Sequence, residues 1–234
     1  VGREEQLRSA ARGVEAAGAS MLRGGAFKPR TSPYEFQGLG EDGLKLLAKA
    51  REETGMPIVT ELLSQDQAEL VAEYSDMLQI GTRNAQNFQL IIAAAKTGKP
   101  VLLKRGMSMR IMEWLLAGEY VLANRNAKLL FCERGIRTFE DYTRNTLDLS
   151  AVAVVKAESH RPIVVDPSQG CGKASLVRSM CKGAVAVGAD ALLVEVHPNP
   201  TEAISDAAQQ IDLKGFATLM NELTPIAESV GREI

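Results

Sequence analysis

The stretch TGKPVLLKR, residues 97–105, is the most informative segment for the fold class of this 234-residue chain. Thr97 and Gly98 are suited to the end of a helix, and Pro100 cannot continue one. An uninterrupted apolar run follows and ends in a lysine and an arginine. Strands that are apolar at every position are typical of parallel sheets covered by helices. The stretch therefore predicts one helix-to-strand step of an α/β protein.

The same step recurs in both directions along the chain. Short apolar runs alternate with longer amphipathic segments, and Val187–Asp190 repeats the glycine-containing entry into a strand. We expect strands at 20–23, 57–62, 77–81, 100–105, 128–133, 162–166 and 191–197. We expect helices at 4–17, 41–54, 65–74, 86–97, 110–123, 147–156 and 173–187, and a C-terminal pair between 202 and 230.

Repeated β–α units occur both in the (β/α)8 TIM barrel and in open doubly wound sheets. We expect the barrel, as a single domain over residues 1–234, because charged residues follow nearly every strand, as the mouth of a barrel requires. Seven strands are visible and the chain opens on a helix. We therefore expect the first strand of the barrel to lie upstream of Val1. A seven-stranded open sheet is the alternative.

Composition excludes several classes of protein. A formal net charge of −2 provides no general basic field for nucleic acid. No apolar run approaches the ~20 residues of a membrane-spanning helix. The three cysteines have no paired spacing and are expected to be free thiols in a reducing compartment. We expect a cytoplasmic protein without a membrane or nucleic-acid partner.

Lysines and arginines gather at the expected carboxyl ends of four strands or just after them. Bringing many like charges to one rim is costly unless anions neutralise them, and guanidinium groups match phosphate and carboxylate oxygens. We predict a site for one or two small polyanions, the alternative being cations that are merely solvated. The residues are Arg23, Lys28, Arg30, Arg83, Lys104, Arg105, Arg134 and Arg137.

Two carboxylates are expected at the same rim. Glu195 ends the last expected strand, and Asp206 lies near the start of the next helix. Two acids at a barrel mouth suit divalent metal binding or proton transfer. The alternative is a helix N-terminal charge for Asp206 and a salt-bridge role for Glu195. His160 precedes a strand, at the opposite end, and is expected to be structural.

Several motifs, in order from about residue 4 to residue 223, resemble the type I-beta class of 3-deoxy-D-arabino-heptulosonate 7-phosphate (DAHP) synthases. The sister family, the octulosonate 8-phosphate synthases, lacks the Lys-Pro-Arg-Thr-Ser run of residues 28–32, which favours erythrose 4-phosphate over arabinose 5-phosphate. The motifs are LRGGAFKPRTSPY (22–34), QIGTRNAQNF (79–88), LLKRG (102–106), CERGIRT (132–138), EVHP (195–198) and SD (205–206).

The resemblance implies condensation of phosphoenolpyruvate with erythrose 4-phosphate, the first step of the shikimate pathway of aromatic amino acid biosynthesis. It also implies a homodimer or homotetramer. Lys104 is implied as a proton carrier, and Asp206 as a second catalytic residue. The residues implied for phosphoenolpyruvate are Arg23, Arg83, Lys104 and Arg134. Those implied for erythrose 4-phosphate are Lys28, Pro29, Arg30 and Thr31.

The resemblance further implies a divalent metal (Mn, Fe, Zn or Co) held by a cysteine, a histidine, a glutamate and an aspartate. Glu195 and Asp206 match the last two ligands. The cysteine motif belongs to the strand that we expect upstream. Gln169 stands at the histidine position, and an amide is a poorer ligand for these metals than imidazole. Cys171 is a candidate substitute, against a packing role.

Three hypotheses stay open on this evidence. The chain is an active synthase with an altered or weak metal site, a non-catalytic or regulatory barrel that still binds ligands, or a condensing enzyme for another aldose phosphate. Phosphate release from phosphoenolpyruvate, with different aldose phosphates and with or without EDTA, distinguishes them.

Overall fold

The structure, a computed structural model, describes residues 2–30 and 32–234. These residues form two compact units. The first unit runs to Leu103 and also takes in Leu116–Leu129, and the second comprises Lys104–Leu115 and Leu130–Ile234. Within the described part of the chain, no helix has the length and hydropathy to cross a membrane.

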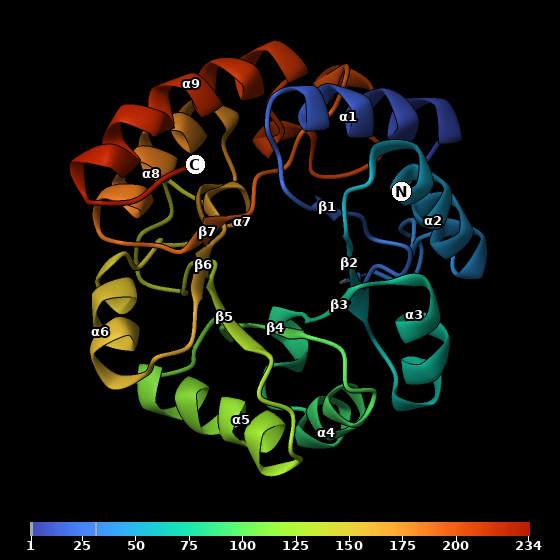
Figure 1. Cartoon of the computed structure of the whole chain (residues 1–234), viewed down its shortest axis with the longest axis vertical. Coiled ribbons are helices and arrows are strands. Elements are labelled where there is room, and N and C mark those ends of the chain that lie inside the picture. Colours follow the sequence, from blue (N-terminus) through green and yellow to red (C-terminus); the bar gives the residue numbers. More distant parts are fainter. Residues whose placement is uncertain (1, 31) are drawn as a thin grey trace. The chain divides into compact units, whose positions relative to one another are not determined.

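The first unit carries the first parallel strands and their crossover helices. Leu22 pairs with Ile58 and Val59 with Met77, so each strand is reached from the previous one by a helical connection. Figure 1 shows α2 lying between α1 and α3, which agrees with their contacts. The elements are α1 (Glu4–Ala16), β1 (Leu22–Arg23), α2 (Glu41–Thr54), β2 (Ile58–Leu62), η1 (Gln65–Gln67), α3 (Ala68–Tyr74), β3 (Met77–Ile80), η2 (Thr82–Asn84), α4 (Phe88–Lys96) and most of β4 (Val101–Lys104).

The second unit continues the same alternation. Phe131 pairs with Ile163 and Val164 with Ala191, again in parallel. Helices α8 and α9 pack side by side, as Figure 1 shows. The elements are β5 (Leu129–Glu133), α6 (Ser150–Glu158), β6 (Ile163–Val165), α7 (Pro167–Cys171), α8 (Ala174–Ala186), β7 (Ala191–Leu192), η3 (Pro200–Glu202), η4 (Ala207–Gln209) and α9 (Leu213–Ser229), while α5 (Ile111–Ala123) contributes to both units.

The prediction of an α/β fold with a parallel sheet is confirmed. Seven strands are found in the described residues, and their order in the sheet follows the chain from β1 to β7. Every residue of β2 and β3 is buried. Burial on both faces explains why these strands are apolar almost throughout. The polar exceptions Thr60, Glu61 and Gln79 are 0%, 6% and 1% exposed, so they need partners inside the protein.

Two predictions for the C-terminal third are wrong. The strand expected at 191–197 ends at Leu192, so Glu195 does not end a strand. Its backbone is held instead by Ile211 N, which donates to Glu195 O at 3.1 Å. The expected pair of C-terminal helices is the single helix α9, which contains Pro225. Asp206 adopts a left-handed backbone (φ 57°) before the short turn η4, which separates this segment from α9.

The expectation of free cysteines is met. Cys132, Cys171 and Cys181 are all buried and unpaired. Desolvation raises the pKa of Cys132 and of Cys181 to about 12, so both thiols stay protonated at neutral pH. These two cysteines therefore behave as small apolar core residues.

Candidate active site

Lys104 and Asp166 form a buried ion pair in the second unit. Lys104 is the last residue of β4, and Asp166 directly follows β6 and caps the N-terminus of α7. Lys104 Nζ lies 2.5 Å from Asp166 Oδ2, and the two side chains are 6% and 1% exposed. Asp166 Oδ1 also accepts a hydrogen bond from Gln169 N at 2.9 Å. The ammonium group is thereby held in one place and its charge is balanced by a buried carboxylate.

Arg134 follows β5 and lies beside this pair. Arg134 Nη2 donates a hydrogen bond to the side-chain oxygen Oε1 of Gln169 at 3.4 Å. Arg134 Nη1 is buried and has no hydrogen-bond partner among the described residues. Burial lowers the pKa of Arg134, and the nearby Asp166 charge only partly opposes that effect. A buried guanidinium nitrogen without a partner is suited to receive an anion.

Glu195 lies at the centre of a second network in the same unit. Its Oε1 accepts from Gln169 Nε2 at 2.8 Å, and its Oε2 accepts from Gln209 Nε2 at 2.9 Å. Arg144 Nη1 donates to Gln209 Oε1 at 3.0 Å and to Asp206 Oδ1 at 3.3 Å. Glu195 and Asp206 thus belong to one connected network of amides, carboxylates and guanidinium groups.

Glu61 is the corresponding centre in the first unit. It lies on β2, and its Oε2 is 3.5 Å from Arg23 Nη2. Gln79 on β3 donates from Nε2 to the same oxygen at 3.1 Å. Gly81 leaves room for this carboxylate, because a Cβ on residue 81 would come within 1.9 Å of Glu61 Oε1. Glu61 therefore fixes the orientation of Arg23.

The loop after β1 carries the other cations predicted for this unit. Lys28 N donates to Gln37 O at 2.8 Å, which ties the loop to its own return segment. Arg30 pairs with Glu35, with Nη2 2.7 Å from Oε1. Pro29 is half-buried between them, and Thr31 lies outside the described residues. Arg83 is exposed in η2, just after β3.

The prediction that Arg105 is one of the rim cations is wrong. Arg105 is buried, and its Nη1 lies 2.9 Å from Glu133 Oε2 and 2.8 Å from Asp148 Oδ2. Its Nε donates to Met109 O at 3.0 Å. Consecutive residues of an extended segment point to opposite faces of a sheet, so Lys104 and Arg105 cannot serve the same site. Arg105 is a structural cation of the second unit.

Comparison with known proteins identifies the family. The model of the DAHP synthetase I family matches residues 1–229. The chain belongs to this family. A curated Thermotoga maritima protein, phospho-2-dehydro-3-deoxyheptonate aldolase, is 50% identical over 230 residues, which are 98% of this chain and 68% of that protein. A 2-dehydro-3-deoxyphosphooctonate aldolase from Syntrophotalea carbinolica is 34% identical over 209 residues, covering 84% of this chain and 74% of that protein.

Solved structures agree with this family. The crystal structure of the Thermotoga maritima phospho-2-dehydro-3-deoxyheptonate aldolase (DAHP synthase) has a TM-score of 0.97 and 50% identity, and the match covers 100% of this chain and 68% of that one. A truncated form of 3-deoxy-D-arabino-heptulosonate 7-phosphate synthase from the same organism has a TM-score of 0.93 and 46% identity, covering 100% of this chain and 85% of that one.

The residues present in this DAHP synthetase family member do not fit the metal site that the resemblance implies. No group of three or more His, Cys, Asp or Glu side chains in the described residues is placed to hold a metal ion. Both oxygens of Glu195 accept N–H groups, and Asp206 faces Arg144. Cys171 is buried, and desolvation raises the pKa of its thiol. In the described residues it forms no such group with Glu195 and Asp206.

Three residues of the candidate site are not predicted by the sequence analysis. Asp166 holds Lys104, Gln209 holds Glu195, and Arg144 joins Gln209 to Asp206. Asp166 could have been found, because it directly follows an expected strand in the same way as the predicted cations do. Gln209 in η4 and Arg144 in the segment between β5 and α6 carry no such signal, since the position of both segments depends on tertiary contacts.

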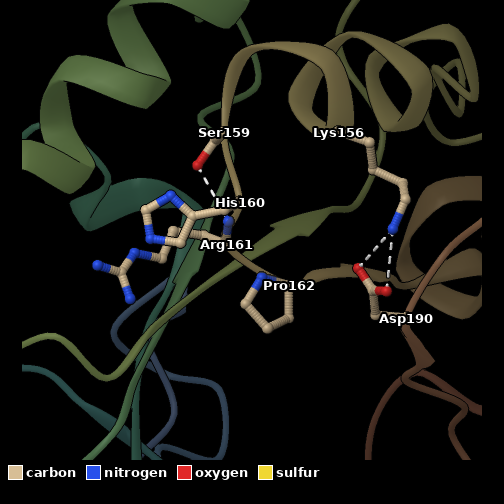
Figure 2. A pocket seen from close by; sticks show the side chains of 6 residues that line it. All are labelled: Lys156, Ser159, His160, Arg161, Pro162 and Asp190. Atoms are coloured by element: carbon tan, nitrogen blue, oxygen red, sulfur yellow. Dashed lines mark hydrogen bonds and ion pairs between the residues drawn. The ribbon is translucent and has the colours of Figure 1, made fainter.

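A pocket of the second unit lies at the opposite end of its strands. It is lined by Lys156, Ser159, His160, Arg161, Pro162 and Asp190. Figure 2 shows Lys156 reaching toward Asp190, with Nζ 3.0 Å from Oδ1, and Ser159 facing the backbone of Arg161. Pro162 directly precedes β6, so His160 is at the amino-terminal end of that strand, whereas Asp166 follows its carboxyl end. His160 takes no part in the networks around Lys104 and Glu195 in this family member.

Proposed function

We propose that the chain catalyses the condensation of phosphoenolpyruvate with erythrose 4-phosphate, giving 3-deoxy-D-arabino-heptulosonate 7-phosphate and inorganic phosphate. Membership of the DAHP synthetase I family and 50% identity to a phospho-2-dehydro-3-deoxyheptonate aldolase support this reaction. The observation that carries it is the buried pair of cations Lys104 and Arg134, of which Arg134 Nη1 lacks a partner within the described chain.

Phosphoenolpyruvate is assigned to Lys104 and Arg134 together with Arg23 and Arg83. The phosphate and carboxylate of this substrate stay anionic through the reaction, so the cations mainly position it and balance its charge. Arg134 presents a guanidinium edge, which suits bidentate contact with a phosphate or carboxylate. The rigid supports of these cations, Asp166 for Lys104 and Glu61 for Arg23, limit the reorganisation needed on binding.

Erythrose 4-phosphate is assigned to Lys28, Pro29, Arg30 and Thr31. Carbon 3 of phosphoenolpyruvate forms the new bond to the aldehyde carbon, water adds at carbon 2, and the carbon–oxygen bond to phosphate breaks. Lys104 is assigned as the proton carrier, because its ammonium group donates a hydrogen bond to the buried carboxylate of Asp166. Asp206 is assigned to the site as a second acid that can exchange a proton.

The finer fold assignment is also a proposal. We infer that residues 1–234 belong to a single (β/α)8 barrel domain. The support is the chain-ordered series of parallel strands joined by helical connections, and the TM-score of 0.97 to the Thermotoga maritima DAHP synthase.

Phosphate release tests the reaction directly. With phosphoenolpyruvate present, we expect release with erythrose 4-phosphate, and a kcat/KM for arabinose 5-phosphate that is roughly 10- to 200-fold lower, the range typical of one additional carbon unit in a binding pocket. A coupled phosphate assay with each aldose measures both. Preference for arabinose 5-phosphate would favour the octulosonate reaction, and release with neither aldose would favour a non-catalytic ligand-binding protein.

The Gly81→Ala variant tests whether Glu61 holds Arg23 in position. The backbone at Gly81 (φ −71°, ψ 160°) accepts alanine, so the effect comes only from the added methyl group, which would displace the carboxylate of Glu61. We expect a stability loss of about 1–3 kcal/mol from overpacking and a higher KM for phosphoenolpyruvate. Urea unfolding and steady-state kinetics measure the two effects. An unchanged KM would argue against the positioning role of Glu61.

A further inference from the structure

Two side-chain amides each donate a hydrogen bond to a different oxygen of the Glu195 carboxylate. We name this arrangement the Gln169–Glu195–Gln209 clamp. Gln169 belongs to α7 and Gln209 to η4, so two separate elements meet at the segment after β7. The hydrogen bonds are 2.8 Å to Oε1 and 2.9 Å to Oε2. Ser168 Oγ accepts from Glu195 N at 3.0 Å, which also holds the backbone of Glu195.

The orientation of both amides follows from their other partners. Arg134 Nη2 approaches Gln169 Oε1 at 3.4 Å, and Arg144 Nη1 approaches Gln209 Oε1 at 3.0 Å. A guanidinium group can only donate, so each amide must turn its oxygen toward the arginine and its NH₂ toward Glu195. An ionised carboxylate can only accept, which requires the same orientation. Glu195 therefore faces N–H donors on both oxygens.

This chemistry is unfavourable for a cation. A metal ion needs lone pairs directed toward it, whereas Gln169 and Gln209 direct N–H groups into the space beside Glu195. Arg134 and Arg144 add positive charge behind the two amides, and Arg144 also pairs with Asp206. A divalent ion would have to break the clamp and approach two guanidinium groups.

We propose that the Gln169–Glu195–Gln209 clamp takes the place of a divalent cation in this protein, and that Gln169 is the residue that determines this. Glu195 is held by hydrogen bonds where a metal-dependent site would hold it by coordination. The segment after β7 thus keeps its position without a metal. The catalytic consequence, condensation without a divalent metal, rests on the proposed function, but the weak binding of cations does not.

Cation binding by the wild-type full-length protein is the first test. After treatment with EDTA and its removal, the protein is titrated with Mn²⁺, and free Mn²⁺ is followed by electron paramagnetic resonance. We expect a dissociation constant weaker than about 10⁻³ M, which is the weak end of protein cation sites. Tight stoichiometric binding of Mn²⁺ would overturn the proposal. No variant is needed for this test, so misfolding cannot obscure it.

Gln169→His is the matched gain-of-binding variant. Imidazole offers a lone pair where the amide offers an N–H, so we expect Mn²⁺ affinity to rise roughly 10- to 100-fold and Mn²⁺ to raise the Tm. Gln89→His is the control, because Gln89 is exposed on α4 and an added histidine there should leave Mn²⁺ affinity unchanged. A Gln169→His protein that folds but binds Mn²⁺ no better than wild type contradicts the role assigned to Gln169.

Activity after EDTA separates this proposal from the proposed function. Phosphate release that persists after EDTA and is not increased by Mn²⁺ supports both. Release that requires Mn²⁺ supports the reaction but overturns the clamp as a replacement for the cation. Absence of both release and Mn²⁺ binding contradicts the proposed function and leaves the clamp supported.

Discussion

Arg134→Met is expected to lower kcat/KM for phosphoenolpyruvate by on the order of 10²- to 10³-fold, the loss seen when one preorganised charge-stabilising donor is removed. Arg134 is 5% exposed, and its Nη1 has no partner in the part of the chain that the structure describes. Water cannot easily replace a guanidinium group at such a buried position. Most of the loss should therefore appear in substrate binding and charge balance rather than in folding.

The stability of the Arg134→Met protein should not fall together with its activity. Burial lowers the pKa of Arg134, which means that the charged form is poorly compensated in the folded protein without a ligand. Methionine removes this buried charge and keeps a similar length, so we expect an unchanged or higher Tm for the ligand-free Arg134→Met protein. Steady-state kinetics and thermal unfolding measure the two properties in parallel.

Arg178→Met is the control for this prediction. Arg178 forms an exposed pair with Glu222 on the surface of α8, so its replacement should change neither activity nor stability by much. A large fall in Tm for Arg134→Met would show that Arg134 is mainly structural. In that case the assignment of phosphoenolpyruvate to this residue would lose its main support.

Periodicity was sufficient to predict most of the fold. The largely apolar strands Ile58–Leu62 and Leu129–Glu133 are buried at every position except the half-buried Leu130, so their composition indicates parallel strands. The segment after Leu192 was not predictable in the same way. It is apolar enough for a strand, but the hydrogen bonds between residues 195–197 and Ile211 replace the expected pairing. The conformation of this segment depends on tertiary contacts that a local sequence pattern does not reveal.

The sequence offers candidate site residues by type and position, but it does not show how they pair. Lys104 ends β4, in agreement with the strand expected at 100–105, yet nothing in the sequence relates it to Asp166, sixty-two positions further on. The gathering of cations suggests that the neighbouring Arg105 shares the site of Lys104, but consecutive residues of a strand point to opposite faces. Applied to residues 104 and 105, this alternation would have separated a site lysine from a structural arginine.

Arg105→Met is expected to lower the free energy of unfolding by about 3–5 kcal/mol, the usual cost of removing one member of a buried ion pair. Arg105 lies between Glu133, which is fully buried, and the partly buried Asp148. Glu133 also accepts from Gly135 N at 2.6 Å, so it cannot turn away to find water. The variant would leave its carboxylate without a counter-charge.

The pH dependence of the Arg105→Met protein identifies the cause. Burial already raises the pKa of Glu133, and loss of Arg105 should raise that pKa further. A carboxyl group whose pKa is higher in the folded state favours folding when protonated. The damage attributable to Glu133 should therefore be small below its unfolded pKa of about 4.3 and should grow as pH rises through the folded pKa. Urea unfolding at several pH values tests this. Arg110→Met, which replaces an exposed residue five positions away, is the control. Its free energy of unfolding should stay within about 0.5 kcal/mol of the wild-type value. A destabilisation that is the same at every pH would mean that lost packing, and not an unpaired Glu133, explains the effect.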